Sequence, residues 1–266
     1  MRQKSRTQKK DDNQEKESTT MSFEYDKVKD PTYFEENRIA AHSDHKWYDS
    51  EQAYLDGENQ LKRSLGGLWK FAYAPNYASS MKGFEALDVD CKNWADIRVP
   101  AHIQMEGYDK PHYTNLVYPW DGFEEVKPGE IPEQFNPVAN YVKYFQVPAQ
   151  MEGKEIFVSF QGVESGFALW VNGQFVGYSE DSFTPSEFCL TPYLKDGENK
   201  MALTVFKWTS SSWCEDQDFF RFSGIFRDVY LYAEPKVHVR DLKVLALVED
   251  NMEEGELKLS FKANLF

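Results

Sequence analysis

Residues 167–178, FALWVNGQFVGY, indicate how this chain folds. Two short runs of aromatic and aliphatic residues flank Asn172-Gly173, the dipeptide that best supplies the two positive φ angles of a type I′ turn. Runs of this length and composition are typical of β-strands, whereas helices need longer segments. The stretch therefore predicts two antiparallel strands joined by a two-residue turn.

Similar segments recur along most of the chain. Residues 68–73 alternate in polarity, residues 140–147 and 155–160 are rich in Val, Ile, Tyr and Phe, and residues 201–207 follow another turn. Helical periodicity of any length is missing, so these regularly spaced short strands predict an antiparallel β-sandwich over residues 47–234. Its expected core residues, at period two in the strands, are Trp69, Phe71, Val158, Phe160, Leu169, Val171, Leu203 and Val205.

The two ends of the chain differ from this pattern. Residues 1–22 contain almost no apolar side chain, and we expect them to be a disordered extension. Residues 23–46 are expected to form an arm that lies over another surface. Residues 235–266 contain two alternating strands. Because two strands are not a stable domain in water, we expect them to be the start of a second β-sandwich that continues beyond this sequence.

The overall composition argues against several classes of protein. A net charge of −14 disfavours general binding of nucleic acid or anionic lipid, and the apolar runs are far shorter than the roughly 20 residues that span a membrane. No secretory signal is visible. Cys91, Cys189 and Cys214 are scattered, which predicts reduced thiols and a cytoplasmic protein without disulfides or zinc. His42 and His45 are interpreted as surface residues, because their spacing places two ligands on one face only in a helix.

The densest group of carboxylates lies in residues 211–231, SSWCEDQDFFRFSGIFRDVYL. In a strand, Asp216 and Asp218 would share one face about 6.7 Å apart, which is compatible with an inverting glycosidase. Their side chains would project in parallel, however, whereas catalysis needs carboxyl groups on opposite sides of the bond. A ligand role suits these residues better than catalysis, since carboxylates bind hard cations and accept hydrogen bonds from sugar hydroxyls. The residues alone favour a structural ion pair of Asp218 with Arg221 or Arg227.

Three longer stretches, residues 99–120, 162–208 and 215–231, resemble in their order and spacing the N-terminal sugar-binding domain of family 2 glycoside hydrolases. The specific likeness is to the large bacterial β-galactosidases of that family. Residues 65–71, LGGLWKF, resemble the entry strand of the domain, with Gly66 where Asn is usual. The resemblance implies a jelly-roll β-sandwich, followed by an immunoglobulin-like domain that begins in residues 235–266. A TIM barrel that carries catalysis follows in complete members and is absent from these residues.

The resemblance also implies roles for two residues. Asp218, the last acid of the EDQD motif, would bind a galactose hydroxyl and a sodium ion whose other ligands come from the barrel. Asn115, in YTNLVYP, would lie on a loop that reaches into the galactose pocket, where its amide suits a sugar hydroxyl; its sequence context alone is typical of a turn. No catalytic residue is expected in this chain, because two glutamates of the barrel would act as acid/base and nucleophile. Magnesium would also bind at the barrel.

Some family members hold a second magnesium ion between the arm and this domain. Here Lys27 and Ser210 occupy positions where carboxylates of that site are expected. Only Asp30 and Glu180 would remain as ligands. The sequence therefore does not predict a complete second magnesium site.

Together these features predict the N-terminal part of a retaining β-galactosidase that hydrolyses terminal non-reducing β-D-galactose residues of lactose-type substrates. Its expected partners are the galactoside, the remaining domains on the same or a separate chain, and further copies in a homo-oligomer. Another family 2 specificity, β-glucuronidase or β-mannosidase, is an alternative, although the EDQD motif favours galactose. A stand-alone carbohydrate-binding module is the alternative from a different class, and the unfinished second sandwich argues against it.

Overall fold

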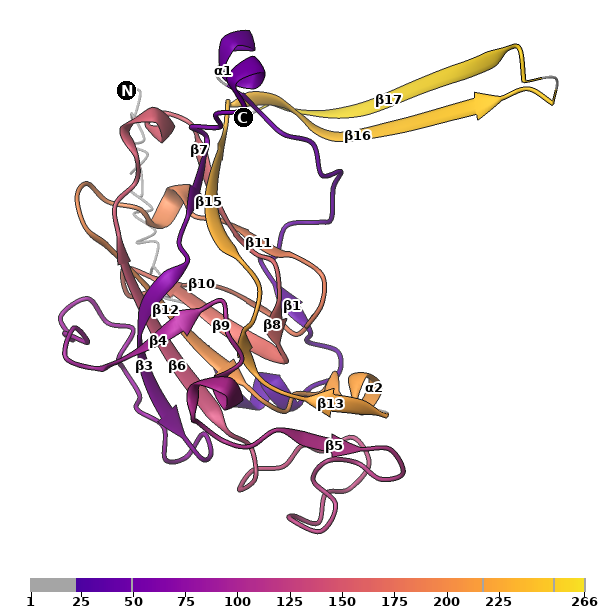
Figure 1. Ribbon diagram of the computed structural model, residues 1–266. Helices are drawn as coiled ribbons and strands as arrows, with labels where there is room; N and C mark the ends of the chain where they lie inside the picture. The colour runs from indigo at the N-terminus through magenta and orange to yellow at the C-terminus, as the bar shows by residue number, and fades with distance from the viewer. Residues whose placement is uncertain (1–22, 49, 217, 251, 266) are drawn as a thin grey trace, which may run out of the picture.

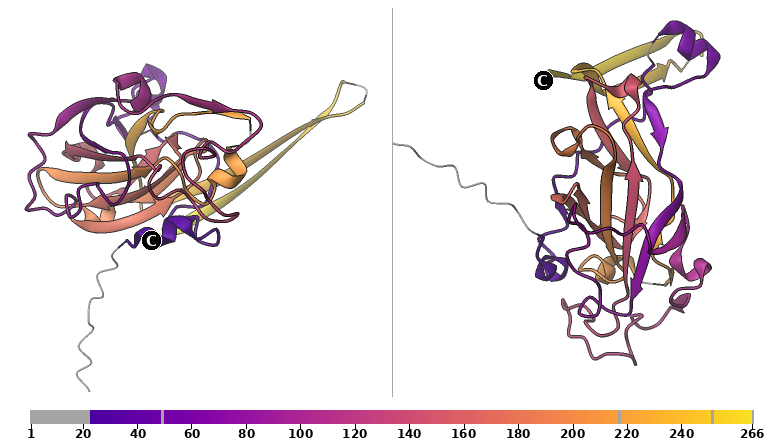
Figure 2. Two further views of the ribbon diagram at one scale, coloured as in Figure 1. Left: turned by 90° about the horizontal axis from the view of Figure 1, so that it is seen from below. Right: turned by 90° about the vertical axis from the view of Figure 1, so that its left-hand side faces the viewer.

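The computed structural model describes residues 23–48, 50–216, 218–250 and 252–265. Its main body is a sandwich of two antiparallel sheets, one with seven strands and one with four (Figures 1 and 2). The predicted all-β sandwich is confirmed. The extension predicted for residues 1–22 lies outside the described residues.

The seven-stranded sheet has the order β1-β10-β9-β12-β6-β3-β4. These strands are β1 (Glu35–Glu36), β10 (Gln174–Ser179), β9 (Gly166–Val171), β12 (Asn199–Phe206), β6 (Val138–Phe145), β3 (Gly67–Ala74) and β4 (Ala95–Val99). The facing sheet has the order β11-β7-β15-β2. Its strands are β11 (Ser186–Cys189), β7 (Glu155–Phe160), β15 (Val229–Glu234) and β2 (Lys62–Ser64).

Smaller elements complete the fold. Two short ribbons pair β5 (His112–Thr114) with β13 (Phe219–Arg221) and β8 (Val163–Glu164) with β14 (Gly224–Ile225). The helices are α1 (Glu51–Asp56) and α2 (Ser212–Glu215), and the 3-10 turns are η1 (Tyr25–Lys29), η2 (Ile103–Glu106), η3 (Ala149–Met151) and η4 (Thr191–Tyr193). None of the helices in the described ranges is long and apolar enough to cross a bilayer. Long helices are absent from this part of the chain, as predicted, but α2 was not expected.

The main hydrophobic core lies between the two sheets. All of the side chains that the sequence predicted for the core belong to it, and none is more than 2% exposed. Burial of one such large apolar side chain contributes about 1.5–3 kcal/mol to folding. The core prediction is confirmed, because strands that alternate at period two place these residues on the inner faces of the sheets.

The outer face of the seven-stranded sheet is also covered. The N-terminal arm crosses it, and the ring of Phe23 packs against the rings of Trp170, Phe175, Tyr178 and Phe206 with centroids 5.4–5.9 Å apart. Every residue of the central strands β9 and β12 is buried in consequence. A strand covered on both faces needs apolar residues at successive positions, which accounts for the unbroken apolar run in β9.

The predicted turn joins β9 to β10. The φ angles of Asn172 and Gly173 are 52° and 81°, as a type I′ turn requires. The Asn172 side chain is buried: its Oδ1 accepts a hydrogen bond from the Lys200 N–H at 3.0 Å, and its Nδ2 donates to Asn199 Oδ1 at 2.7 Å. Asn172 therefore forms the turn and also fixes β9 to β12.

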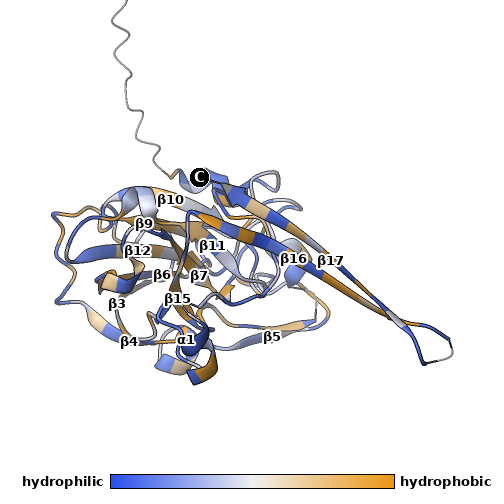
Figure 3. Cartoon of the chain, turned by 90° about the horizontal axis from the view of Figure 1, so that it is seen from above, coloured by the Kyte–Doolittle hydropathy of each residue, from blue (hydrophilic) through white to orange (hydrophobic). Residues whose placement is uncertain are grey.

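A long hairpin of β16 (Val237–Val248) and β17 (Gly255–Leu265) extends away from the sandwich (Figure 1). Apolar and polar residues alternate along it (Figure 3). Val244 pairs with Leu259 across the hairpin, and these side chains are 57% and 59% exposed, while Phe261 is 68% exposed. Both strands predicted after the sandwich are present, and their apolar residues are open to solvent in the described structure.

Replacing Asn172 by Ala should destabilise the chain by about 2–3 kcal/mol. The change leaves buried backbone and side-chain groups without partners, at about 1–3 kcal/mol each, and puts a residue that tolerates positive φ less well into the turn. Chemical denaturation would measure the loss. Asn93→Ala, at an exposed position, should change the free energy of unfolding by less than about 0.5 kcal/mol. Equal losses in the two variants would contradict the role of Asn172.

Candidate functional site

The β5–β13 ribbon brings the two predicted ligand-binding residues together. Thr114, the last residue of β5, pairs with Phe219, the first residue of β13. Asn115 follows β5 directly, and Asp218 directly precedes β13. Because the strands are antiparallel, the chain leaves β5 and enters β13 at the same end of the ribbon. Asn115 and Asp218 therefore meet there, although they are far apart in the sequence.

Both residues line one open pocket of about 110 Å³. The remaining lining residues are Leu116, Val117, Tyr118 and Asp216. Asn115 and Asp218 are themselves exposed. Because ligand pockets typically measure about 300–1,000 Å³, the described residues form one wall of a site and not an enclosed cavity.

The backbone around Asp216 and Asp218 does not form the continuous strand in which their spacing was considered. Helix α2 ends at Glu215, Asp218 has a φ of 51°, and β13 begins only at Phe219. The two carboxylates do not share a strand face, since Asp216 is 1% exposed whereas Asp218 is open to solvent. A continuous strand is not formed because the Glu215 N–H donates to the Ser211 carbonyl and closes a helical turn, a local contact that the composition does not reveal.

Arg221 is completely buried behind this wall and forms an ion pair with Asp216. Its Nη1 also lies 3.6 Å from Oε1 of Glu164. In the described structure neither Arg221 nor Arg227 pairs with Asp218, and Arg227 donates to backbone carbonyl groups. The structural ion pair considered for Asp218 is therefore not formed, and the Asp218 carboxylate stays at the pocket.

Sequence analysis missed Glu164, a titratable residue that contacts the buried Arg221. Burial raises the pKa of Glu164 to about 7, although Arg221 counteracts part of the shift. Burial also lowers the pKa of His102, whose Nδ1 lies 3.8 Å from Glu164 Oε2. Glu164 lies in the stretch 162–208 that carries the family resemblance, but its sequence context assigns it no role; its one signal is a charged residue between two predicted strands.

Aromatic packing and one carboxylate fix the loop that carries Asn115. The ring of Tyr118 stacks on Trp120, with centroids 5.0 Å apart and planes 8° apart. Further along, the Glu124 carboxylate accepts hydrogen bonds of 2.9 Å from three successive backbone N–H groups, residues 133–135. Long loops in compact domains are commonly functional. This loop, between β5 and β6, is anchored at several points and so can hold Asn115 in a defined place.

A buried polar network connects the ribbon to the sandwich. Lys207, directly after β12, is 1% exposed, and its Nζ lies 2.5 Å from Oδ2 of Asp109. Gln104 donates to Asp109 at 2.9 Å and to the Ser223 hydroxyl at 3.0 Å, and its Oε1 accepts from the Ser223 N–H at 3.0 Å. Since Asp109 precedes β5 and Ser223 follows β13, the network ties both strands of the ribbon to the central strand of the large sheet.

The described residues contain no group of three or more His, Cys, Asp or Glu side chains placed to hold a metal. Asp218 can offer one carboxylate to a sodium ion, so the other ligands would have to come from elsewhere. Glu180 accepts a hydrogen bond from the Ser210 hydroxyl at 2.8 Å, and Asp30 accepts one from the Thr32 hydroxyl at 2.7 Å. Each of these two carboxylates therefore bonds to a hydroxyl group of the chain.

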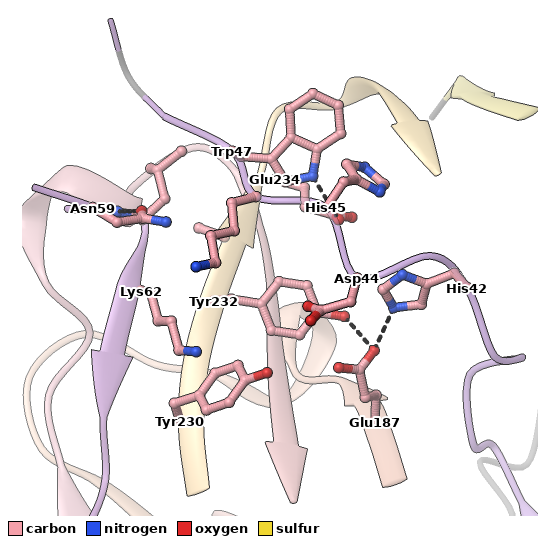
Figure 4. Close-up of a pocket in the computed structure, with 13 residues that line it drawn as sticks. His42, Asp44, His45, Trp47, Asn59, Lys62, Glu187, Tyr230, Tyr232 and Glu234 are labelled. Carbon is pink, nitrogen blue, oxygen red and sulfur yellow. Dashed lines mark hydrogen bonds and ion pairs between the residues drawn. The ribbon is translucent and has the colours of Figure 1, made fainter. Parts of the chain in front are cut away.

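A second pocket, of about 80 Å³, lies where the arm meets β15 and β2 (Figure 4). In Figure 1, β15 runs toward α1, whereas the β5–β13 ribbon lies at the other end of the sandwich. His42 Nε2 lies 2.7 Å from Glu187, the Tyr232 hydroxyl donates to the same carboxylate at 2.8 Å, and the Trp47 ring N–H donates to Glu234 at 3.1 Å. These polar groups form hydrogen bonds with one another, so the pocket lies at the interface by which the arm is attached to the sandwich.

The pair of His42 and Glu187 should make the attachment of the arm depend on pH. The hydrogen bond to Glu187 raises the pKa of His42, against the opposing effects of burial and Arg240. A histidine whose pKa is raised in the folded state stabilises that state fully below the unfolded pKa of about 6.5, and the contribution is lost as pH rises through the folded value. Wild type should therefore exceed His42→Gln in unfolding free energy by more at about pH 6 than at about pH 9. Chemical denaturation that gives the same difference at both pH values would contradict this.

Replacing Arg221 by Met should lower the free energy of unfolding by about 3–5 kcal/mol, because Asp216 and Glu164 would stay buried without their cation. This loss of unfolding free energy should be smaller at about pH 5.5 than at about pH 8.5, because Glu164, whose pKa is about 7, is mostly protonated and neutral at the lower pH. Arg98→Met, which removes an exposed ion pair with Glu106, should cost less than about 1 kcal/mol. Urea denaturation compares the two variants, and a loss in Arg221→Met as small as in the control would refute the structural role of Arg221.

Comparison with known proteins identifies the family. Residues 62–235 match the model of the sugar-binding domain of glycosyl hydrolases family 2. A β-galactosidase of Halalkalibacterium halodurans is 51% identical over 236 residues, which are 88% of this chain and 23% of that protein. A β-galactosidase of Clostridium acetobutylicum is 48% identical over 239 residues, or 89% of this chain and 26% of that protein. A β-galactosidase large subunit of Latilactobacillus sakei is 41% identical over 86% of this chain and 39% of that protein.

Solved structures share the fold at lower sequence identity. A β-glycosidase from Bacteroides vulgatus is 22% identical with a TM-score of 0.58, over 77% of this chain and 24% of that one. A β-glucuronidase from an uncultured Clostridium species is 20% identical with a TM-score of 0.58, over 84% of this chain and 36% of that one. The chain spans about a quarter of the length of the first two relatives. Because the family model matches most of the sandwich, the chain belongs to glycosyl hydrolase family 2, whose sugar-binding domain it carries in residues 62–235.

Proposed function

We propose that this chain is the N-terminal part of a retaining β-galactosidase that hydrolyses terminal non-reducing β-D-galactose residues of lactose-type substrates. The observation that carries the proposal is that Asn115 and Asp218 line the same pocket. Relatives named β-galactosidase, at 41–51% identity, support the same substrate. On this proposal the chain supplies one wall of a site that a longer enzyme completes.

The two pocket residues offer complementary groups to a sugar. The amide of Asn115 both donates and accepts hydrogen bonds, as a hydroxyl does, whereas an ionised Asp218 only accepts. Sugars differ in the orientation of single hydroxyl groups, and a buried polar group left unmatched costs about 1–3 kcal/mol. The role of this chain is therefore to recognise and orient the substrate.

Cleavage of the glycosidic bond would fall to residues outside this chain. A retaining glycosidase needs two carboxyl groups about 5–5.5 Å apart on either side of the bond. Of the two acids at this pocket, Asp216 is buried in its ion pair with Arg221. Asp218 alone cannot act as both acid/base and nucleophile, so no catalytic role is assigned to the described residues.

Metal ions enter the proposal in a limited way. Asp218 would give one oxygen ligand to a sodium ion, which would add positive charge next to the sugar oxygens. Magnesium would bind at the catalytic barrel, away from the residues described. Both ions, the cytoplasmic location and the homo-oligomeric assembly remain predictions from the sequence and the family.

A β-glucuronidase is the second candidate, because solved enzymes of that name share the fold. A glucuronide carries a carboxylate, and the pocket presents the exposed Asp218 with no Lys or Arg among its described lining residues. Like charges in contact repel, so the pocket favours a neutral sugar. A self-contained binding module has less support, since a wall of about 110 Å³ would bury little of a sugar.

The proposal can be tested with the full-length enzyme and o-nitrophenyl β-galactoside. Asp218→Asn and Asn115→Ala should each raise KM about tenfold or more, the effect of losing about 1.4 kcal/mol of substrate binding. Asp218→Asn should also remove the dependence of the rate on sodium. Both side chains are exposed, so Tm should fall by less than about 2 °C.

Asn93→Ala is the matched control, because it changes an exposed Asn away from the pocket. Early melting of Asp218→Asn with an unchanged KM would contradict a ligand role for Asp218. Preferential hydrolysis of p-nitrophenyl β-glucuronide would contradict the proposed substrate. Turnover of galactosides by residues 1–266 alone would contradict the assignment of cleavage to residues outside this chain.

A further inference from the structure

Tyr113 lies next to the pocket but is not one of its lining residues. It is the middle residue of β5 and is 49% exposed. Its hydroxyl donates a hydrogen bond of 2.8 Å to Oδ1 of Asp218. The proposed function makes no use of this bond, although it joins Tyr113 to a carboxylate that would contact the sugar.

The ribbon holds the ring of Tyr113 in place. Tyr113 pairs with Phe220 across the two strands, and the two rings stack with centroids 4.8 Å apart and planes 29° apart. The rings of Phe220 and Phe222 also stack, with centroids 6.5 Å apart. A phenol has few rotatable bonds, so a stacked tyrosine can aim its hydroxyl at little cost in conformational entropy.

Asp218 has fewer constraints of its own. It is exposed and has a φ of 51°, in a region that residues other than glycine seldom occupy. A carboxylate free to rotate at such a position would lose that freedom when it binds a sugar. Ordering one side chain on binding weakens affinity by about 2- to 12-fold, unless another group has already oriented it.

The Tyr113 hydroxyl is suited to this task because it donates directly to a carboxylate oxygen. Hydrogen bonds to an ionised acceptor are also stronger than those between neutral groups.

We propose that Tyr113 is a positioning residue that orients the Asp218 carboxylate for the sugar without itself contacting the reacting atoms. The inference rests on the proposed function, because it concerns the same galactoside site. A carboxylate that is oriented before the sugar binds stabilises the bound substrate and the transition state equally. Its loss should therefore raise KM and leave kcat nearly unchanged.

In the full-length enzyme, Tyr113→Phe should raise both KM for o-nitrophenyl β-galactoside and Kd for a non-hydrolysable thiogalactoside about fivefold, with kcat changed by less than about twofold. Tyr54→Phe makes the same chemical change at a tyrosine of α1 that is 63% exposed, and it should change none of these constants. An unchanged Kd in Tyr113→Phe would overturn the inference.

The Asp218→Ala background shows whether Tyr113 acts through Asp218. There, Tyr113→Phe should weaken thiogalactoside binding no further, since the carboxylate that it orients is gone. The same fivefold loss in both backgrounds would mean that Tyr113 touches the sugar itself or acts on the fold, and would overturn the positioning role.

An experiment without substrate separates this inference from the proposed function. In the 266-residue chain at neutral pH, NMR of ring-labelled tyrosine should show that Asp218→Ala shifts the signal of the Tyr113 ring carbon that carries the hydroxyl, because the acceptor of its hydrogen bond is gone. An unchanged signal would overturn the pairing of Tyr113 with Asp218 even in an active galactosidase. A full-length enzyme that hydrolyses no galactoside would instead refute the proposed function, while the pairing would still be judged by the NMR signal.

Discussion

The buried guanidinium group of Arg221 determines how the end of the sandwich can be built. A guanidinium group that has lost its contact with water needs carboxylate partners, and Asp216 and Glu164 supply them. Asp216 follows α2, Glu164 lies on β8 and Arg221 ends β13, so the pairing fixes three segments at once. Asp218 stands between Asp216 and β13, and its position at the pocket is a consequence of this buried charge cluster.

The sandwich supplies the rigid frame to which this cluster is attached. β12 is buried along its whole length and continues directly into Lys207. The contacts from Lys207 through Asp109 and Gln104 to Ser223 form a buried network, which is stable only when its members satisfy one another. The spacing of β5 and β13, and so of the two pocket residues that they carry, therefore depends on packing well inside the fold.

The sequence predicted those features that depend on a residue and its neighbours along the chain. The turn at Asn172 follows from the φ angles that it tolerates, and the core follows from the period of the strands. Residues 212–215 form a helical turn through local backbone bonds that no helical pattern in the sequence indicates. Glu164 and Arg221 were missed as partners, and so was Tyr113 beside Asp218, because these contacts depend on strand register and no spacing along the chain encodes that register.

The same arrangement separates the charges that stabilise the fold from the charge that faces the pocket. If Arg221 paired with Asp218, the guanidinium would occupy several acceptor sites of that carboxylate and neutralise its charge. Arg221 pairs with the buried Asp216 instead, and Asp218 receives a hydroxyl from Tyr113. That bond uses one of about four lone-pair sites on the carboxylate and adds no positive charge. Asp218 is thereby oriented, while its charge and its other acceptor sites stay available to a sugar or a cation.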